Sequence, residues 1–125
     1  MKPGRSAHAF YCSHPSSRVV GVMTLLPDHV RRRLPPLYAQ EDLGDDAVVH
    51  IHFFVAGGRG DWWITEGSPE DDDFIMFGLC DLGFPELGYV SLNEMESVGM
   101  VERDLYWKPK TLGEVREGLP GGQRC

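Results

Sequence analysis

The sequence predicts a small single domain of the α+β class: an antiparallel sheet of about four strands with two or three short helices. Segments dense in β-branched and aromatic residues alternate with short turns rich in glycine, proline or aspartate. These turns are shorter than the crossovers of about ten or more residues that parallel strands require. A length of 125 residues suits one domain with one core.

The first predicted element is a short amphipathic helix. Pro27 suits a first helical turn, and Leu26, Val30 and Leu34 recur at four-residue spacing. Pro35 lacks the N–H that a continuing helix would use, so the helix is expected to end before it.

Three strands are predicted next. The segment 47–55 is rich in β-branched residues, and 61–66 forms its hairpin partner across a glycine-rich turn. Residues 68–73 are predicted to be a loop, because their three consecutive aspartates would repel one another in a strand. The largely apolar segment 74–82 is predicted to be a central strand.

The last third of the domain is predicted to hold a turn, a strand and two helices. Residues 83–88 form the turn, 89–98 begin extended and become helical, and 102–109 form the fourth strand. Each helix start has a hydroxyl residue three positions before a glutamate, the pattern of a capping box. The two pairs are Ser91 with Glu94 and Thr111 with Glu114.

The chain divides into three parts. Residues 1–22 lack hydrophobic periodicity and are rich in Ser, Pro, Gly and Arg, so we expect a disordered leader. Residues 23–118 form the α+β domain, and 119–125 are expected to be a flexible tail.

Composition indicates a cytoplasmic protein that makes no membrane contact. No apolar run reaches the roughly 18 residues of a spanning helix, and the N-terminus lacks the apolar stretch of a secretory signal. Three cysteines without CxxC spacing indicate neither a disulfide framework nor a zinc site. The common phosphate-loop, dinucleotide, zinc-protease and hydrolase motifs are absent from the sequence, so no cofactor is expected.

The charge is strongly acidic and uneven. Residues 41–125 carry eighteen acidic and six basic side chains. Residues 1–40 carry one acidic and six basic side chains. Nucleic-acid binding is therefore disfavoured over most of the surface. The acidity either keeps the protein soluble as a monomer or weak dimer, or imitates DNA toward a basic partner.

Three carboxylates are the candidate catalytic groups. Asp81 and Glu86 flank a glycine-rich turn and are candidates for a pair that, with Glu66, would hold a divalent ion. The structural alternative is that Asp81 accepts hydrogen bonds from the amides of the turn, with Cys80 as a small buried residue.

His50 and His52 are candidates for metal ligands. At two-residue spacing in a strand both rings face one side, which suits joint ligation. The alternative is a pair of half-exposed histidines alternating with Val49, Ile51 and Phe53, which face the core.

Four aromatic residues are the candidate binding residues. Trp62 and Trp63 are adjacent in a strand and so face opposite sides, with one in the core and the other, where exposed, a contact residue. Trp107 and its neighbour Tyr106 repeat the arrangement on the fourth strand. Tyr89 adds an aromatic ring to the glycine-rich segment 78–92.

Three stretches resemble a known family. They read MTLLP (23–27), FGLCDLGFPELGYVSLNEME (77–96) and VERDLYWKPKTLGE (101–114). Over about residues 23–117 the chain resembles domain of unknown function 2958, whose members are small bacterial proteins often carried on mobile genetic elements. The resemblance implies an α+β domain in the cytoplasm and supplies no catalytic residue.

We therefore expect a non-enzymatic binding or accessory protein of bacterial mobile elements, acting through an unidentified protein partner. The alternatives are a small metal-dependent hydrolase or nuclease that uses Glu66, Asp81 and Glu86, and an acidic DNA mimic that acts in counter-defence.

Overall fold

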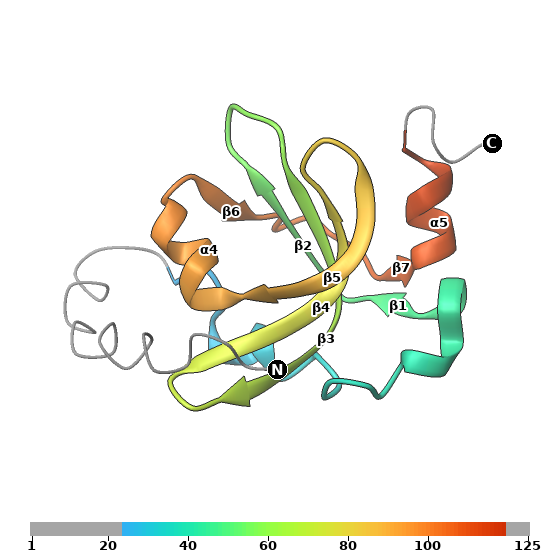
Figure 1. Ribbon diagram of the computed structural model, residues 1–125, viewed down its shortest axis with the longest axis horizontal. Helices are drawn as coiled ribbons and strands as arrows, with labels where there is room; N and C mark the ends of the chain where they lie inside the picture. The colour runs from blue at the N-terminus through green and yellow to red at the C-terminus, as the bar shows by residue number, and fades with distance from the viewer. Residues whose placement is uncertain (1–23, 120–125) are drawn as a thin grey trace.

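The computed structural model describes residues 24–119, which form a five-stranded antiparallel sheet, a two-stranded sheet and short helices. The predicted α+β class is confirmed (Figure 1). The predicted leader, 1–22, and residues 120–125 of the predicted tail lie outside the described residues. The strands are β1 (Val48–Val49), β2 (Ile51–Val55), β3 (Asp61–Glu70), β4 (Asp73–Asp81), β5 (Pro85–Ser91), β6 (Val101–Arg103) and β7 (Lys110–Thr111). The helices are α3 (Asp28–Arg31), the 3₁₀ helix η1 (Glu41–Asp46), α4 (Leu92–Val98) and α5 (Leu112–Glu117).

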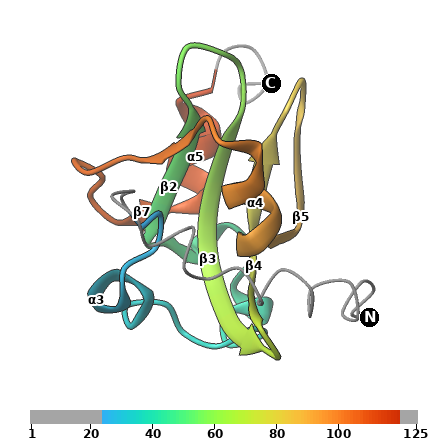
Figure 2. The same cartoon turned by 90° about the vertical axis from the view of Figure 1, so that its left-hand side faces the viewer.

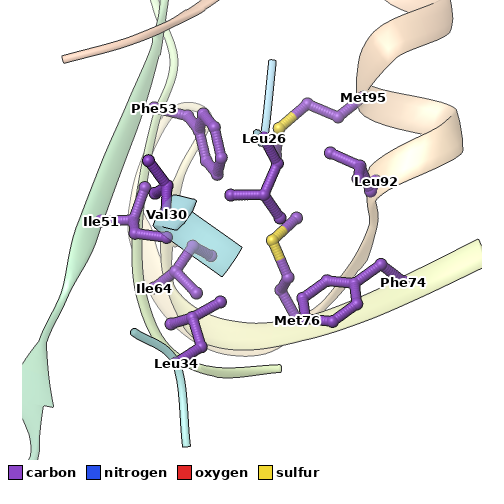
Figure 3. Packing of buried hydrophobic residues seen from close by; sticks show 10 residues of the cluster. All are labelled: Leu26, Val30, Leu34, Ile51, Phe53, Ile64, Phe74, Met76, Leu92 and Met95. Atoms are coloured by element: carbon purple, nitrogen blue, oxygen red, sulfur yellow. The ribbon is translucent and has the colours of Figure 1, made fainter. Parts of the chain in front are cut away.

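The main sheet has the strand order β5-β4-β3-β2-β6, and helices cover both of its faces. Figures 1 and 2 show α4 and α5 on opposite sides of the sheet. The larger apolar cluster lies between the sheet and helices α3 and α4 (Figure 3). The smaller cluster joins the other face of the sheet to β1 and α5 and includes Trp63, Leu79 and Val115.

The predicted N-terminal helix is confirmed, although it is a single turn. α3 begins after Pro27, which is the N-cap residue, and ends at Arg31. Leu26, Val30 and Leu34 are all buried in the larger cluster, as their four-residue spacing predicted.

The segment 47–55 forms two strands rather than one. β1 pairs with β7, whereas β2 pairs with β3 and β6. His50 lies at the junction, and its amide donates to the Ile64 carbonyl at 2.9 Å. The chain thus changes sheets at one residue, which a continuous β-branched pattern does not reveal.

The loop predicted for 68–73 is wrong, because the turn consists only of Asp71 and Asp72. Asp71 has a φ of +55°, a conformation that aspartate tolerates better than most residues. Asp73 is buried and accepts a hydrogen bond from the Asn93 amide at 3.0 Å. Hydrogen bonding to the start of α4 therefore stabilises an aspartate that was expected to be repelled.

The turn predicted for 83–88 is also too long. β5 begins at Pro85, so the β4–β5 turn comprises residues 82–84. Proline and glycine within β5 resembled a turn in the sequence, but an edge strand tolerates both.

The strand predicted for 102–109 is too long at its C-terminal end. β6 ends at Arg103, and the Asp104 carboxylate then accepts a hydrogen bond from the Tyr106 amide at 3.0 Å. This local bond turns the chain, so Trp107 follows a turn rather than lying on a strand.

Both predicted helix starts are confirmed. Ser91 caps α4 by accepting from the Glu94 amide at 3.1 Å, and its hydroxyl donates to Asp73. Thr111 and Glu114 form a complete capping box at α5.

Candidate functional site

An exposed apolar surface lies along strand β5. This strand pairs with β4, and within residues 24–119 no strand pairs with its other edge. Leu87 is 46% exposed and Tyr89 56% exposed. Phe84 in the preceding turn and Tyr38 are exposed as well. We call Tyr38, Phe84, Leu87 and Tyr89 the β5 surface.

Tyr38 and Tyr89 meet although they are far apart in the sequence. A hydrogen bond with Tyr38, followed by partial burial and the nearby charges of Glu66 and Glu41, raises the pKa of Tyr89 to about 12. The Tyr89 ring also packs against Phe77, with 4.9 Å between centroids. The Tyr89 hydroxyl therefore remains protonated at neutral pH and is available as a hydrogen-bond donor and acceptor.

Glu66 holds the loop that presents Tyr38. Its carboxylate is buried and accepts from the Tyr38 amide at 2.8 Å and from the Gln40 amide at 2.7 Å. Tyr38 has a φ of +76°, a strained conformation for tyrosine. The charged acceptor fixes this turn, so Glu66 positions a residue of the β5 surface.

The Gln40 side chain hydrogen-bonds the same loop to strands β1 and β3. Sequence reasoning did not identify this residue. Its side-chain oxygen accepts from the Val48 amide at 2.7 Å, while its nitrogen donates to the carbonyls of Val48 and Thr65 at 3.0 and 2.8 Å. This amide thus substitutes for a strand partner at the end of β1.

The structure keeps the three candidate catalytic acids apart. Glu86 lies opposite Cys80 in the ladder, so Asp81 and Glu86 point to opposite faces of the sheet. Glu66 lies opposite Phe77, four residues before Asp81 on β4, which corresponds to a separation of about 13 Å along the strand.

Asp81 takes the structural role considered as its alternative. Its Oδ1 accepts from the Gly83 amide at 3.1 Å within the β4–β5 turn. Neighbouring Cys80 is half-buried, and burial together with the charge of Glu86 raises the pKa of its thiol to about 11. The thiol is therefore protonated, and unreactive, at neutral pH.

His50 and His52 have different surroundings. Burial, and then the charge of Arg33, lower the pKa of His50. His52 lies between two carboxylates, with Nε2 2.8 Å from Asp61 Oδ1 and Nδ1 2.9 Å from Asp104 Oδ2. Within residues 24–119 no three histidine, cysteine or acidic side chains are grouped to hold a metal ion.

The carboxylates occupy both nitrogens of His52. A neutral imidazole has one N–H, so both contacts are hydrogen bonds when the ring carries two protons. The ring also stacks on Trp63, with 5.2 Å between centroids and 5° between planes. His52 therefore joins β2, β3 and the turn after β6, with both ring nitrogens facing carboxylates.

The candidate tryptophans are mainly structural in their contacts. Trp63 is buried in the smaller cluster, whereas Trp62 is half-buried and packs against the larger one, so they face opposite sides as predicted. Trp107 is half-buried, donates from Nε1 to the Val49 carbonyl at 3.0 Å and lies 5.1 Å from Lys110 Nζ.

Replacing Asp104 by asparagine should weaken folding in a pH-dependent way. Partial burial alone raises the pKa of Asp104, but hydrogen bonds from His52 and the Tyr106 amide, with the charge of His52, lower it below its usual value. The stabilisation is therefore fully present above about pH 4 and is lost as the pH falls through the depressed pKa.

Urea unfolding at pH 7 and at pH 2.5 checks this expectation. We expect Asp104→Asn to reduce the free energy of unfolding by about 1–2 kcal/mol at pH 7 and by much less at the acidic pH. Asp45→Asn is the control, because Asp45 makes an exposed ion pair with Arg116 at 3.1 Å. This substitution should reduce the free energy of unfolding by less than about 1 kcal/mol. A loss for Asp104→Asn that is equal at both pH values would contradict the assignment.

The comparisons identify one family. The model of the family described as "Protein of unknown function (DUF2958)" matches residues 25–113. No curated protein and no solved structure matches the chain. No helix of residues 24–119 has the length and apolar character needed to cross a membrane.

Proposed function

The chain belongs to the DUF2958 family of proteins of unknown function, and we propose that it is a non-enzymatic accessory protein that binds a protein partner through the β5 surface. We place it in the bacterial cytoplasm, as a monomer or weak dimer. The setting of a mobile genetic element follows the family resemblance.

The exposed apolar side chains of an unpaired edge strand carry this proposal. Edge strands are ordinarily protected from other chains by charge, proline or covering segments. β5 has Pro85 and Glu86 at its beginning, but Leu87 and Tyr89 follow with about half of their area exposed. Exposed aromatic and aliphatic side chains of this kind are typical of partner-binding sites.

The positioning of Tyr38 supports the same proposal. Glu66 and Gln40 hold a strained turn whose side chain lies beside Tyr89 on the surface. A rigid aromatic contact loses little conformational entropy on binding, so a fixed turn here favours recognition. We prefer this function to metal-assisted hydrolysis, because Glu66, Asp81 and Glu86 do not share one face of the sheet.

Affinity capture from the host tests the proposal with a matched pair of double variants. Leu87→Ser with Tyr89→Ser removes two residues of the β5 surface. Leu105→Ser with Tyr106→Ser removes the same residue types from the turn after β6, where both are exposed.

The first double variant should lose the captured partner, and the second should retain it. The second should unfold at nearly the wild-type urea concentration, because exposed side chains contribute little to stability. The first should remain folded but unfold at a slightly lower urea concentration, because Tyr89 also packs against Phe77. An unchanged partner for the first variant would exclude the β5 surface. Loss only in the second would move the binding site to the turn after β6.

A further inference from the structure

We infer that β5 binds an extended segment of the partner by antiparallel strand addition, and that apolar and basic residues alternate along this segment. The inference rests on the proposed function, which it makes specific: it names the binding mode and the chemistry of the bound segment. Three features of β5 support it: the direction of its backbone groups, the alternation of its side chains and the charge around it.

The hydrogen-bond ladder determines which backbone groups of β5 point away from β4. The N–H and C=O of one residue in an antiparallel ladder point to the same side, and the side alternates along the strand. The carbonyl of His52 accepts from the Asp104 amide, so the backbone groups of His52 point away from β3. One row of directly paired residues runs across strands β2, β3, β4 and β5. Its members, in that order, are His52, Trp63, Leu79 and Leu87.

The alternation along this row shows which N–H and C=O groups of β5 point away from β4. Because His52 points away from β3, the groups of Trp63 point toward β4 and those of Leu79 toward β3. The groups of Leu87, and of Tyr89 two residues later, therefore point outward from the edge. The two residues with exposed apolar side chains are also those with outward backbone donors and acceptors.

The side chains of β5 alternate between the two faces of the sheet. Leu87 and Tyr89 lie on one face, while Glu86 and Gly88 lie on the other. A residue paired directly across from a strand residue shares its face. An added strand would therefore place apolar side chains beside Leu87 and Tyr89, with a basic side chain beside Glu86.

Acidic side chains lie on and near β5. The charges of Glu41 and Glu66 act on Tyr89, and Glu86 lies on the strand itself. Within residues 24–119 the basic side chains lie on other elements: Arg31, Arg32, Arg33, Arg59, Arg103, Lys108, Lys110 and Arg116. A second copy of this chain would bring acidic groups together, whereas an added strand with a basic side chain beside Glu86 complements the charge on that face.

Gly88 adds an independent observation. A Cβ at Gly88 would meet no atom within 4 Å, and its φ is not positive, so neither packing nor backbone conformation within residues 24–119 requires glycine there. Glycine in a strand that its own fold does not require is typical of a place where another chain approaches closely.

The probe is a blocked seven-residue peptide in which lysine and valine alternate, titrated into ¹⁵N-labelled full-length protein. We expect the largest amide shifts in β5, and binding that weakens as salt rises. A peptide with glutamate in place of lysine should bind at least about tenfold more weakly.

N-methylated peptides test the backbone pairing without altering the protein. Antiparallel pairing places valine across from Leu87, so methylation of the valine nitrogens should weaken binding at least about tenfold. Methylation of the lysine nitrogens should leave binding within about twofold, because those groups face solvent.

The outcomes separate the two proposals. Equal binding of both methylated peptides, or of the glutamate peptide, would overturn strand addition even if Leu87→Ser with Tyr89→Ser abolishes partner capture. The same β5 shifts on raising the concentration of protein alone would also overturn it, by showing that a second copy occupies the edge. Unchanged partner capture by that double variant would overturn the proposed function itself.

Discussion

Replacing Gly78 by alanine is expected to prevent folding or to destabilise the protein by about 3 kcal/mol or more. A Cβ on Gly78 would lie 2.0 Å from the Trp63 carbonyl oxygen and 2.8 Å from Ile64 Cα. Both atoms belong to the backbone of β3 beside an irregularity in the β3–β4 register. No rotation of a side chain relieves this overlap, so two strands of the main sheet would have to separate.

Gly88→Ala is the matched control, because Gly88 is paired directly with Gly78. A Cβ there meets nothing within 4 Å, so we expect a change below about 0.5 kcal/mol. Urea unfolding and one-dimensional NMR spectra of the two variants make the comparison. Equal stability of Gly78→Ala and Gly88→Ala would contradict the close approach of β3 and β4.

Patterns that depend on neighbouring residues predicted much of the fold. The spacing of Leu26, Val30 and Leu34 identified three buried residues, of which Val30 lies in the first helix and the other two flank it. The two hydroxyl–glutamate pairs identified the starts of α4 and α5. Each of these signals needs only a few residues along the chain. Alternation along the chain likewise predicted that Val49, Ile51 and Phe53 are buried.

The errors occurred where distant residues stabilise a local conformation. Asp73 resembled part of a repelling charged loop, but it is stabilised by the amide and hydroxyl groups at the start of α4. The first four residues of β5, 85–88, resembled a turn, because glycine and proline are common both in turns and in edge strands. Pairing with β4 decides between these alternatives, and pairing partners are not encoded by local composition.

The surroundings of the candidate residues were the least predictable part. Asp61 approaches His52 through the β2–β3 hairpin, which a known hairpin register would have revealed. Asp104 reaches the same ring only because β6 lies beside β2. The meeting of Tyr38 with Tyr89 likewise needs the loop that Glu66 and Gln40 hold.

Replacing Glu66 by glutamine is expected to reduce the free energy of unfolding by about 2–4 kcal/mol. Glutamine has nearly the same size, but its amide group would present a donor to one of the two N–H groups that Glu66 now accepts from Tyr38 and Gln40. The buried position offers little water to compensate, since Glu66 is 3% exposed. Glu66→Ala should lower stability further, because it removes both acceptors.

Glu86→Gln is the control, since Glu86 lies exposed on β5 and should change stability by less than about 0.5 kcal/mol. Urea unfolding measures all three variants, and ¹⁵N spectra of the folded fraction report whether the amides of Tyr38 and Gln40 shift. A Glu66→Gln protein as stable as wild type would contradict a structural role for this carboxylate. A large loss with shifts at both amides would mean that the acid first considered for catalysis instead fixes the turn beside Tyr89, and so shapes the surface that we propose binds the partner.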